Sequence, residues 1–195
     1  MAASQLSVLV FCGARPGNDP AFLAAAREMG TRIAANGWRL VYGAGDVGLM
    51  GAVAEAAIAA GGNTLGIIPQ HLVPRERRTV DLGQVIVTET MHERKKVMFM
   101  NADMVAVLPG GAGSLDEVFE VLTWRQIGLH EKPIYLINTE GYWDKLIGLV
   151  AHVIDHGFAD PSLRDGLIAV QDSAAFEAHA QMTLARSGQA RRDKC

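Results

Sequence analysis

The chain has 195 residues, of which 49% are apolar and 21 are glycine, and this length suits one domain with a large core. A formal net charge of −3 gives no electrostatic reason to expect a nucleic-acid partner, and no stretch approaches the roughly 18 apolar residues of a membrane span. Cys12 and Cys195 are the whole cysteine content, which suggests no disulfide framework, so we expect a reducing, cytoplasmic location.

Segments typical of strands and of helices alternate along the chain. The predicted strands are apolar and lie at 6–12, 39–42, 64–68, 85–87, 104–108, 133–137 and 167–170. The predicted helices lie at 20–35, 48–60, 91–101, 114–128, 142–156 and from 173 onward. This alternation predicts a Rossmann-like, doubly wound α/β fold, with a mostly parallel sheet and helices on both faces. We expect one domain over residues 1–185 and a disordered basic tail over 186–195.

Two glycine loops follow predicted strands, where ligands bind in sheets of this class. The first spells G-x-G-x-x-G and runs from Gly43 and Gly45 to Gly48. A dinucleotide site would also need an acidic residue at the end of the next strand, and that strand ends at Pro69 without one. The pattern therefore disfavours a nicotinamide cofactor, and a tight turn with close helix–sheet packing accounts for Gly48.

The second glycine loop follows the most apolar strand and leads into a helix. It reads Pro109-Gly110-Gly111-Ala112-Gly113-Ser114-Leu115-Asp116-Glu117. Glycines let backbone N–H groups turn outward, and a helix start adds unpaired N–H donors and a positive dipole end. No Gly-Lys-Ser/Thr follows, so this is not a triphosphate loop of the Walker type. The loop predicts a phosphate site for a mononucleotide.

Two interpretations of Ser114 and Glu117 remain open on spacing alone. Ser-x-x-Glu at a helix start is the pattern of a capping box, in which each side chain bonds to the backbone near the other. The same glutamate, placed beside a phosphate loop, is also a candidate catalytic carboxylate. A capping box explains the serine and the glutamate, but it does not explain the three preceding glycines.

The helix before this loop carries two basic side chains on an apolar stripe. Met91, Lys95 and Met98 are spaced at i, i+4 and i+7, and Arg94 flanks the same stripe. Lys and Arg can also extend from such positions to solvent, so the spacing alone allows either a solvated face or a site. The start of this helix should lie near the second glycine loop, where an arginine suits phosphate or carbonyl oxygens.

At these residues the sequence resembles the LOG (Lonely Guy) family, the cytokinin riboside 5′-monophosphate phosphoribohydrolases also labelled "possible lysine decarboxylase". The family signature reads P-G-G-x-G-T-x-x-E, and the resemblance covers roughly residues 5 to 185. The matching segments are 11–13, 41–51, 91–95, 108–117, 122–124, 126–128, 130–133, 141–143 and 157–158. The decarboxylase label carries little weight, because such enzymes use pyridoxal phosphate on a lysine in much longer chains.

The resemblance implies a Rossmann-like fold, a homodimer, and a reaction in which water cleaves a nucleoside 5′-monophosphate into free base and ribose 5-phosphate. It implies catalytic roles for Arg94 and Glu117, with no metal and no cofactor. The candidate substrate-binding residues, which include two of the first loop, are Gly43, Gly45, Glu76, Lys95, Gly110, Gly111, Ala112, Gly113, Ser114, Leu115, Asp116 and Thr123. Glu117 would stabilise the oxocarbenium-like ribose and activate water, and Arg94 would offset developing negative charge.

Three departures from the family pattern affect the base preference more than the chemistry. Ser114 replaces the motif threonine but keeps its hydroxyl group, and Ala44 replaces a glycine of the first loop. An arginine, Arg15, stands near the expected mouth of the pocket.

The alternative function is a non-catalytic nucleotide or molybdenum-cofactor carrier on the same fold, which would not need both Arg94 and Glu117.

Overall fold

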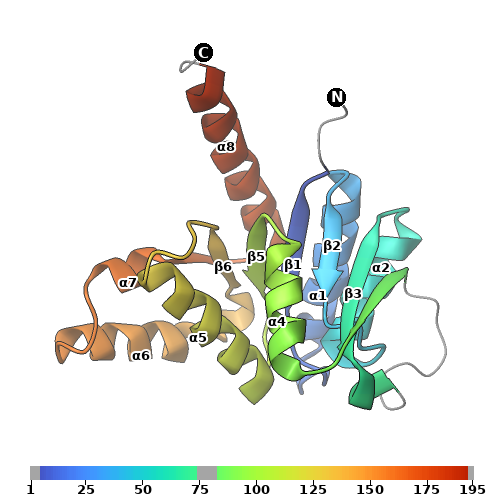
Figure 1. Ribbon diagram of the computed structural model, residues 1–195, viewed down its shortest axis with the longest axis horizontal. Helices are drawn as coiled ribbons and strands as arrows, with labels where there is room; N and C mark the ends of the chain where they lie inside the picture. Colours follow the sequence, from blue (N-terminus) through green and yellow to red (C-terminus); the bar gives the residue numbers. More distant parts are fainter. Residues whose placement is uncertain (1–4, 74–82, 193–195) are drawn as a thin grey trace.

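The protein folds around a seven-stranded sheet whose strands all run parallel (Figure 1). The computed structural model describes residues 5–73 and 83–192. The strand order is β4-β3-β2-β1-β5-β6-β7. The strands are β1 (Ser7–Phe11), β2 (Arg39–Tyr42), β3 (Thr64–Pro69), β4 (Gln84–Thr88), β5 (Met104–Val107), β6 (Ile134–Ile137) and β7 (Leu167–Val170). The expected α/β fold is confirmed, because all paired strands are parallel and helices lie between most consecutive strands.

Helices cover the sheet on both faces (Figure 1). They are α1 (Pro20–Ala35), α2 (Gly48–Ala59), α4 (Met91–Met100), α5 (Ala112–Gln126), α6 (Asp144–Asp155), α7 (Ser162–Asp165) and α8 (Ser173–Arg192), with short 3₁₀ turns η1 (Gln70–Leu72) and η2 (Thr139–Gly141). The Asp19 carboxylate caps α1 by accepting from Ala21 N. Helix α8 continues past residue 185, where we expected the ordered domain to end.

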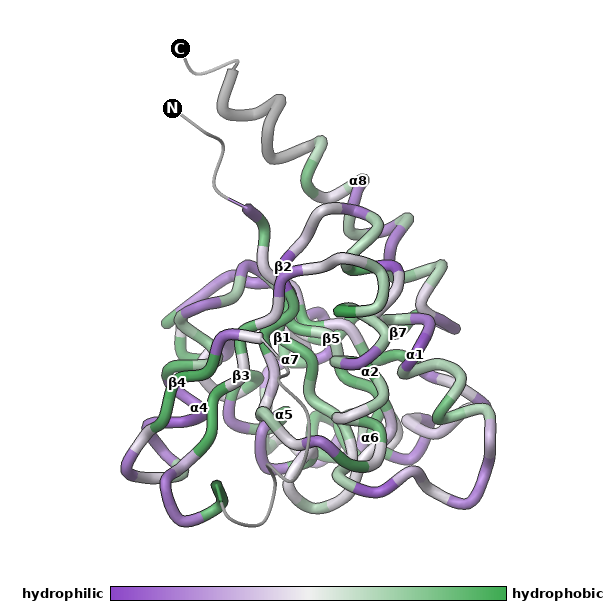
Figure 2. Tube along the Cα trace, turned by 90° about the vertical axis from the view of Figure 1, so that its right-hand side faces the viewer, coloured by the Kyte–Doolittle hydropathy of each residue, from purple (hydrophilic) through white to green (hydrophobic). Residues whose placement is uncertain are grey.

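Two hydrophobic clusters, one on each face, hold the helices to the sheet. Alternate residues of β1 divide between them: Val8 and Val10 face α1, α2 and α8, whereas Leu9 and Phe11 face α4, α5 and α6. Figure 2 shows strongly hydrophobic segments along the strands of the sheet. Because both faces are buried, the strands read as continuous apolar runs in the sequence.

The strand order reverses direction between β1 and β5. The chain runs from β1 outward through β2 and β3 to β4, and then returns to build β5, β6 and β7 on the other side. In open parallel sheets, ligands bind at the carboxyl ends of the strands that flank this switch point. Here those ends carry the segment after β1, which begins at Cys12, and the Pro109–Gly111 loop after β5. Among the described residues, no helix has the length and apolar character needed to cross a bilayer.

Candidate active site

The loop after β5 leads directly into the N-terminus of α5. Gly111 is the N-cap residue, and no side chain caps this helix end, so its first N–H groups face the loop. Helix α5 therefore begins at Ala112, two residues before the predicted start, and Ser114 lies inside its first turn. Of the two interpretations left open for Ser114 and Glu117, the capping box is excluded, since the serine does not occupy the cap position.

Gly110 is packed so closely that no larger residue fits. A Cβ atom there would overlap the Ser114 hydroxyl and crowd the Gly13 backbone. The amide of Gly13 in turn donates to the Pro109 carbonyl oxygen at 3.0 Å, which ties the loop after β1 to the loop after β5. The glycines thus let the two loops at the switch point touch through their backbones, with a helix N-terminus beside them.

Arg94 on α4 is buried, with 5% of its surface exposed, although it is a charged residue. Its Nε donates to the Ile67 carbonyl oxygen at 3.1 Å, and Nη2 donates to the Gly43 carbonyl oxygen at 2.8 Å. The other terminal nitrogen, Nη1, lies 3.9 Å from Met91 Sδ, a weak acceptor. The backbone of two strand ends therefore fixes the guanidinium and leaves Nη1 able to donate to a ligand.

Gly43 explains why Arg94 can lie so deep. A Cβ at this position would overlap Arg94 Nη2, so only glycine leaves room for the guanidinium against the backbone. The neighbouring Ala44 has φ +59°, a left-handed conformation that costs an L-residue about 1 kcal/mol and that glycine adopts freely. Both positions of the first loop therefore favour glycine: Gly43 for space, and position 44, where this chain departs from the family pattern with alanine, for backbone conformation.

Glu117 lies on α5, lines the same cavity as Arg94 and is close enough to feel its charge. Burial raises its pKa from 4.5 to about 7; the charge of Arg94 opposes this rise and the charge of Asp116 adds to it. Burial also raises the pKa of the Cys12 thiol, and the nearby charge of Glu117 adds to that effect. A carboxyl group that exchanges its proton near neutral pH is suited to acid–base chemistry.

Lys95 joins α4 to α5. Its ammonium lies 2.9 Å from Asp116 Oδ2 and 3.1 Å from Glu120 Oε1, and its side chain is 8% exposed. Burial disfavours the charged amine, but the hydrogen bonds and ion pairs with the two carboxylates outweigh burial and raise the pKa of Lys95. Arg94, Lys95 and Met98 form the buried face of α4, so this face is not a solvated one.

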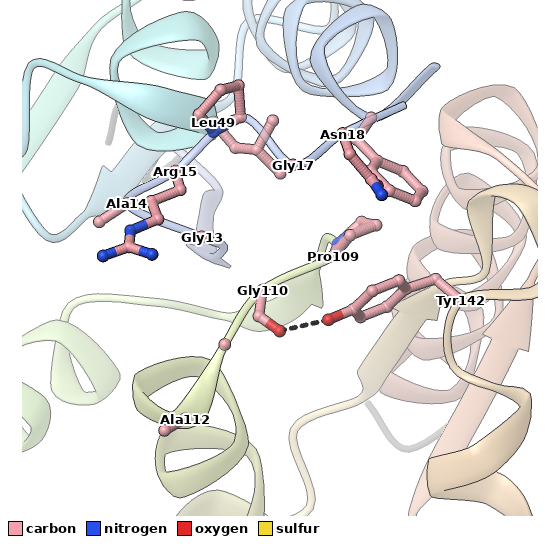
Figure 3. Close-up of a pocket in the computed structure, with 13 residues that line it drawn as sticks. Gly13, Ala14, Arg15, Gly17, Asn18, Leu49, Pro109, Gly110, Ala112 and Tyr142 are labelled. Atoms are coloured by element: carbon pink, nitrogen blue, oxygen red, sulfur yellow. Dashed lines mark hydrogen bonds between the residues drawn. The ribbon is translucent and has the colours of Figure 1, made fainter. Parts of the chain in front are cut away.

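A cavity of about 160 Å³ gathers most of the candidate site residues. Its walls include Arg94, Lys95, Gly111, Gly113, Ser114, Asp116 and Glu117, together with Cys12, Ala14, Met50 and Met91. A larger cleft of about 620 Å³ adjoins it, because Ala14 and Gly111 line both. Gly110 and Ala112 line this cleft on one side; Arg15 and Asn18, from the loop after β1, lie across from them (Figure 3).

Four candidate residues of the described segments line neither space: Gly43, Gly45, Leu115 and Thr123. Gly43 instead packs against the Arg94 guanidinium. Leu115 lines a separate groove beside α6, and Thr123 is exposed six residues beyond Glu117 on α5. Gly45 donates its N–H to Met50 Sδ at 3.3 Å, so it reaches the smaller cavity through that side chain. Glu76 falls outside the described residues.

Sequence reasoning assigned no site role to Cys12 or Tyr142. Cys12 lies at the carboxyl end of β1, beside the switch point, and lines the cavity with Arg94 and Glu117. The rule that ligands bind where the strand order reverses could have singled out this position once the order was known. Tyr142 follows η2 and reaches the glycine loop after β5 only through the fold, where its hydroxyl donates to the Gly110 carbonyl oxygen at 2.6 Å.

The sequence is similar to a group of plant enzymes. The family described as possible lysine decarboxylase matches residues 50–182. Cytokinin riboside 5′-monophosphate phosphoribohydrolase LOG1 of Arabidopsis thaliana is 39% identical over 162 residues, which are 83% of this chain and 76% of that protein. The probable phosphoribohydrolase LOG4 of Oryza sativa subsp. japonica is 40% identical over 168 residues, 86% of this chain and 73% of that protein.

Solved structures with the same fold are more distant in sequence. The molybdenum cofactor carrier protein from Chlamydomonas reinhardtii matches with a TM-score of 0.71 at 22% identity, covering 93% of this chain and 99% of that one. The molybdenum cofactor binding protein from Rippkaea orientalis matches with a TM-score of 0.70 at 20% identity, covering 94% and 99%. At these identities the likeness shows the fold alone.

Proposed function

Since the chain belongs to the LOG family, also described as possible lysine decarboxylases, we propose that it hydrolyses the N-glycosidic bond of nucleoside 5′-monophosphates. The products are the free base and ribose 5-phosphate. The observation that best supports this activity is the meeting of Arg94 and Glu117, from two different helices, in one cavity beside the phosphate loop. A carrier that only binds a nucleotide has no need of a buried arginine next to a carboxyl group that titrates near neutral pH.

The 5′-phosphate would occupy the larger cleft at the start of α5. The uncapped N–H groups after Gly111 and the positive end of the helix dipole favour an anion there. Arg15, exposed on the facing loop, adds a positive charge across the cleft (Figure 3). A phosphate held in the cleft would direct the ribose past Ala14 and Gly111 into the cavity of Glu117, since these two residues line both spaces.

The catalytic step follows from the charges of the smaller cavity. As the N-glycosidic bond breaks, positive charge develops on the ribose and negative charge on the departing base. Ionised Glu117 stabilises the sugar and accepts a proton from the attacking water, while Arg94 Nη1 donates to the substrate and offsets negative charge. The departing base takes up a proton from Glu117 or from solvent, which gives the free base and restores the carboxylate. Binding of the phosphate, remote from the reacting bond, orients the sugar for attack.

Lys95 supports the carboxylates of α5 in this proposal. Its ammonium is paired with Asp116 and Glu120, and its raised pKa keeps it protonated. A lysine that forms a Schiff base must instead lose its proton, so the environment of Lys95 does not suit decarboxylase chemistry.

We also propose that the protein acts as a homodimer in the cytoplasm.

Release of the base tests the function directly. Isopentenyladenosine 5′-monophosphate, AMP and the two matching ribosides are incubated with the protein, and free base is measured by chromatography. We expect release from the monophosphates and not from the ribosides, because the ribosides cannot use the phosphate loop. Binding of the monophosphates without release from either would refute hydrolysis and favour the carrier function.

A further inference from the structure

Tyr142 holds one peptide of the phosphate loop by a hydrogen bond. Its hydroxyl donates to the Gly110 carbonyl oxygen at 2.6 Å, which Figure 3 shows as a dashed line. The ring packs edge-on against Phe22 at 5.5 Å and against Trp143 at 4.8 Å between centroids. Side chains from α1 and from the start of α6 therefore fix where the hydroxyl points.

The segment that carries Tyr142 is itself anchored to the sheet. Trp143 is 2% exposed and donates from Nε1 to the Val107 carbonyl oxygen, at the end of β5, at 3.2 Å. Its backbone N–H donates to Asn138 Oδ1 at 2.7 Å, and Asn138 Nδ2 donates to Asp144 Oδ1 at 2.7 Å. The turn after β6 thus bonds to β5 and to the loop that follows β5, which makes it a rigid support.

The bonded carbonyl determines where the next N–H points. In a planar trans peptide the carbonyl oxygen and the N–H lie on opposite sides, so the Gly111 N–H points away from Tyr142. Both residues of this peptide are glycines, and a Cβ at Gly111 would meet nothing within 4 Å. Side-chain sterics at Gly111 therefore do little to prevent the peptide from turning over, which would aim a carbonyl oxygen at a bound anion.

We propose that Tyr142 is a positioning residue that keeps the Gly110–Gly111 peptide in its anion-binding orientation and thereby sets the affinity for the phosphate of the substrate. The inference rests on the proposed function, because it assumes that a phosphate binds beside Gly111, which lines both the cleft and the catalytic cavity. Tyr142 would act through the loop backbone and need not touch the reacting atoms.

The test compares wild type with Tyr142→Phe, which removes only the hydroxyl and keeps the ring packing. We expect KM for AMP to rise roughly two- to twelvefold, the range for loss of one hydrogen bond, with little change in kcat or in its pH profile. The inhibition constant of ribose 5-phosphate should rise by the same factor, and that of adenine should stay constant, because adenine carries no phosphate. Lys145→Ala, an exposed neighbour, serves as the matched control.

If Tyr142→Phe leaves KM for AMP and the inhibition constant of ribose 5-phosphate unchanged, the inference is overturned. The hydrogen bond would then be only structural, even if the Tm of the variant falls. An equal loss for adenine would overturn it as well, because the effect would not be specific to phosphate. If wild type releases no base, the proposed function fails separately. The role of Tyr142 is then judged by calorimetric binding of ribose 5-phosphate: weaker binding by Tyr142→Phe supports it, and equal binding refutes it.

Discussion

Replacing Glu117 by glutamine should stop the reaction and also make the folded protein more stable above neutral pH. Burial raises the pKa of Glu117 from 4.5 to about 7, so between these values the folded state holds a proton that the unfolded chain has lost. Stability then falls as the pH rises through this window and levels off above about pH 7.5. Glutamine has nearly the same shape but does not ionise, so the variant escapes this cost.

The size of the effect follows from the two pKa values. A difference from 4.5 to about 7 corresponds to about 3 kcal/mol at pH 8 and to nothing at pH 4, where both forms are neutral. In a chain of 195 residues, 1 kcal/mol moves Tm by about 2–4 °C. Glu117→Gln should therefore melt roughly 6–12 °C above wild type at pH 8 and together with it at pH 4.

The activity of the wild type should depend on the same ionisation of Glu117, but it should rise with pH where the stability falls. If the carboxylate is the working form, kcat/KM for AMP rises about tenfold per pH unit on the acidic side and is about a hundredfold below its plateau at pH 5. The second ionisation of a phosphate, near pH 6, contributes a limb of its own. Any residual activity of Glu117→Gln keeps only that second limb, which separates the two groups.

Two measurements decide the matter: calorimetric melting from pH 4 to 8 and base release over the same range. Equal melting of both proteins at every pH would mean that the Glu117 carboxyl group is not held in a desolvating environment. Retained base release by Glu117→Gln would refute its catalytic role, whatever the melting curves show.

Three further substitutions or treatments test the surroundings of this carboxyl group. Gly43→Ala should lower kcat/KM about a hundredfold with an unchanged circular dichroism spectrum, because a Cβ there displaces the Arg94 guanidinium; near-normal activity would refute the role of that packing. Lys95→Met removes a positive charge that lowers the pKa of Glu117, so the acidic limb of the pH profile should move to higher pH; movement to lower pH would contradict the charge assignment. In the Cys195→Ser variant, Cys12 should react slowly with iodoacetamide at pH 8 until the chain is denatured, because burial raises the pKa of its thiol. A fast reaction in the native state would show that the thiol is accessible.

The order of apolar and polar residues along the chain was enough to predict the layers of the fold and the loops that carry the candidate site. Alternating apolar strands and helices can bury their surfaces only as a parallel sheet covered on both faces, and this local pattern is written in consecutive residues. The glycines after β5 and the basic stripe at Arg94 and Lys95 were readable for the same reason. Family resemblance then joined these segments to a reaction and to the pairing of Arg94 with Glu117.

The effects of residues on one another across long distances in the chain could be seen only in the folded protein. The spacing of Ser114 and Glu117 allowed either a helix cap or a catalytic role for Glu117, because a cap depends on where the helix begins. In the structure α5 begins at Ala112, which excludes the cap. The raised pKa of Glu117 comes from burial by segments far away in the chain, which no local pattern contains. Tyr142 reaches Gly110 across 32 positions of sequence, and strand order alone brings the two together.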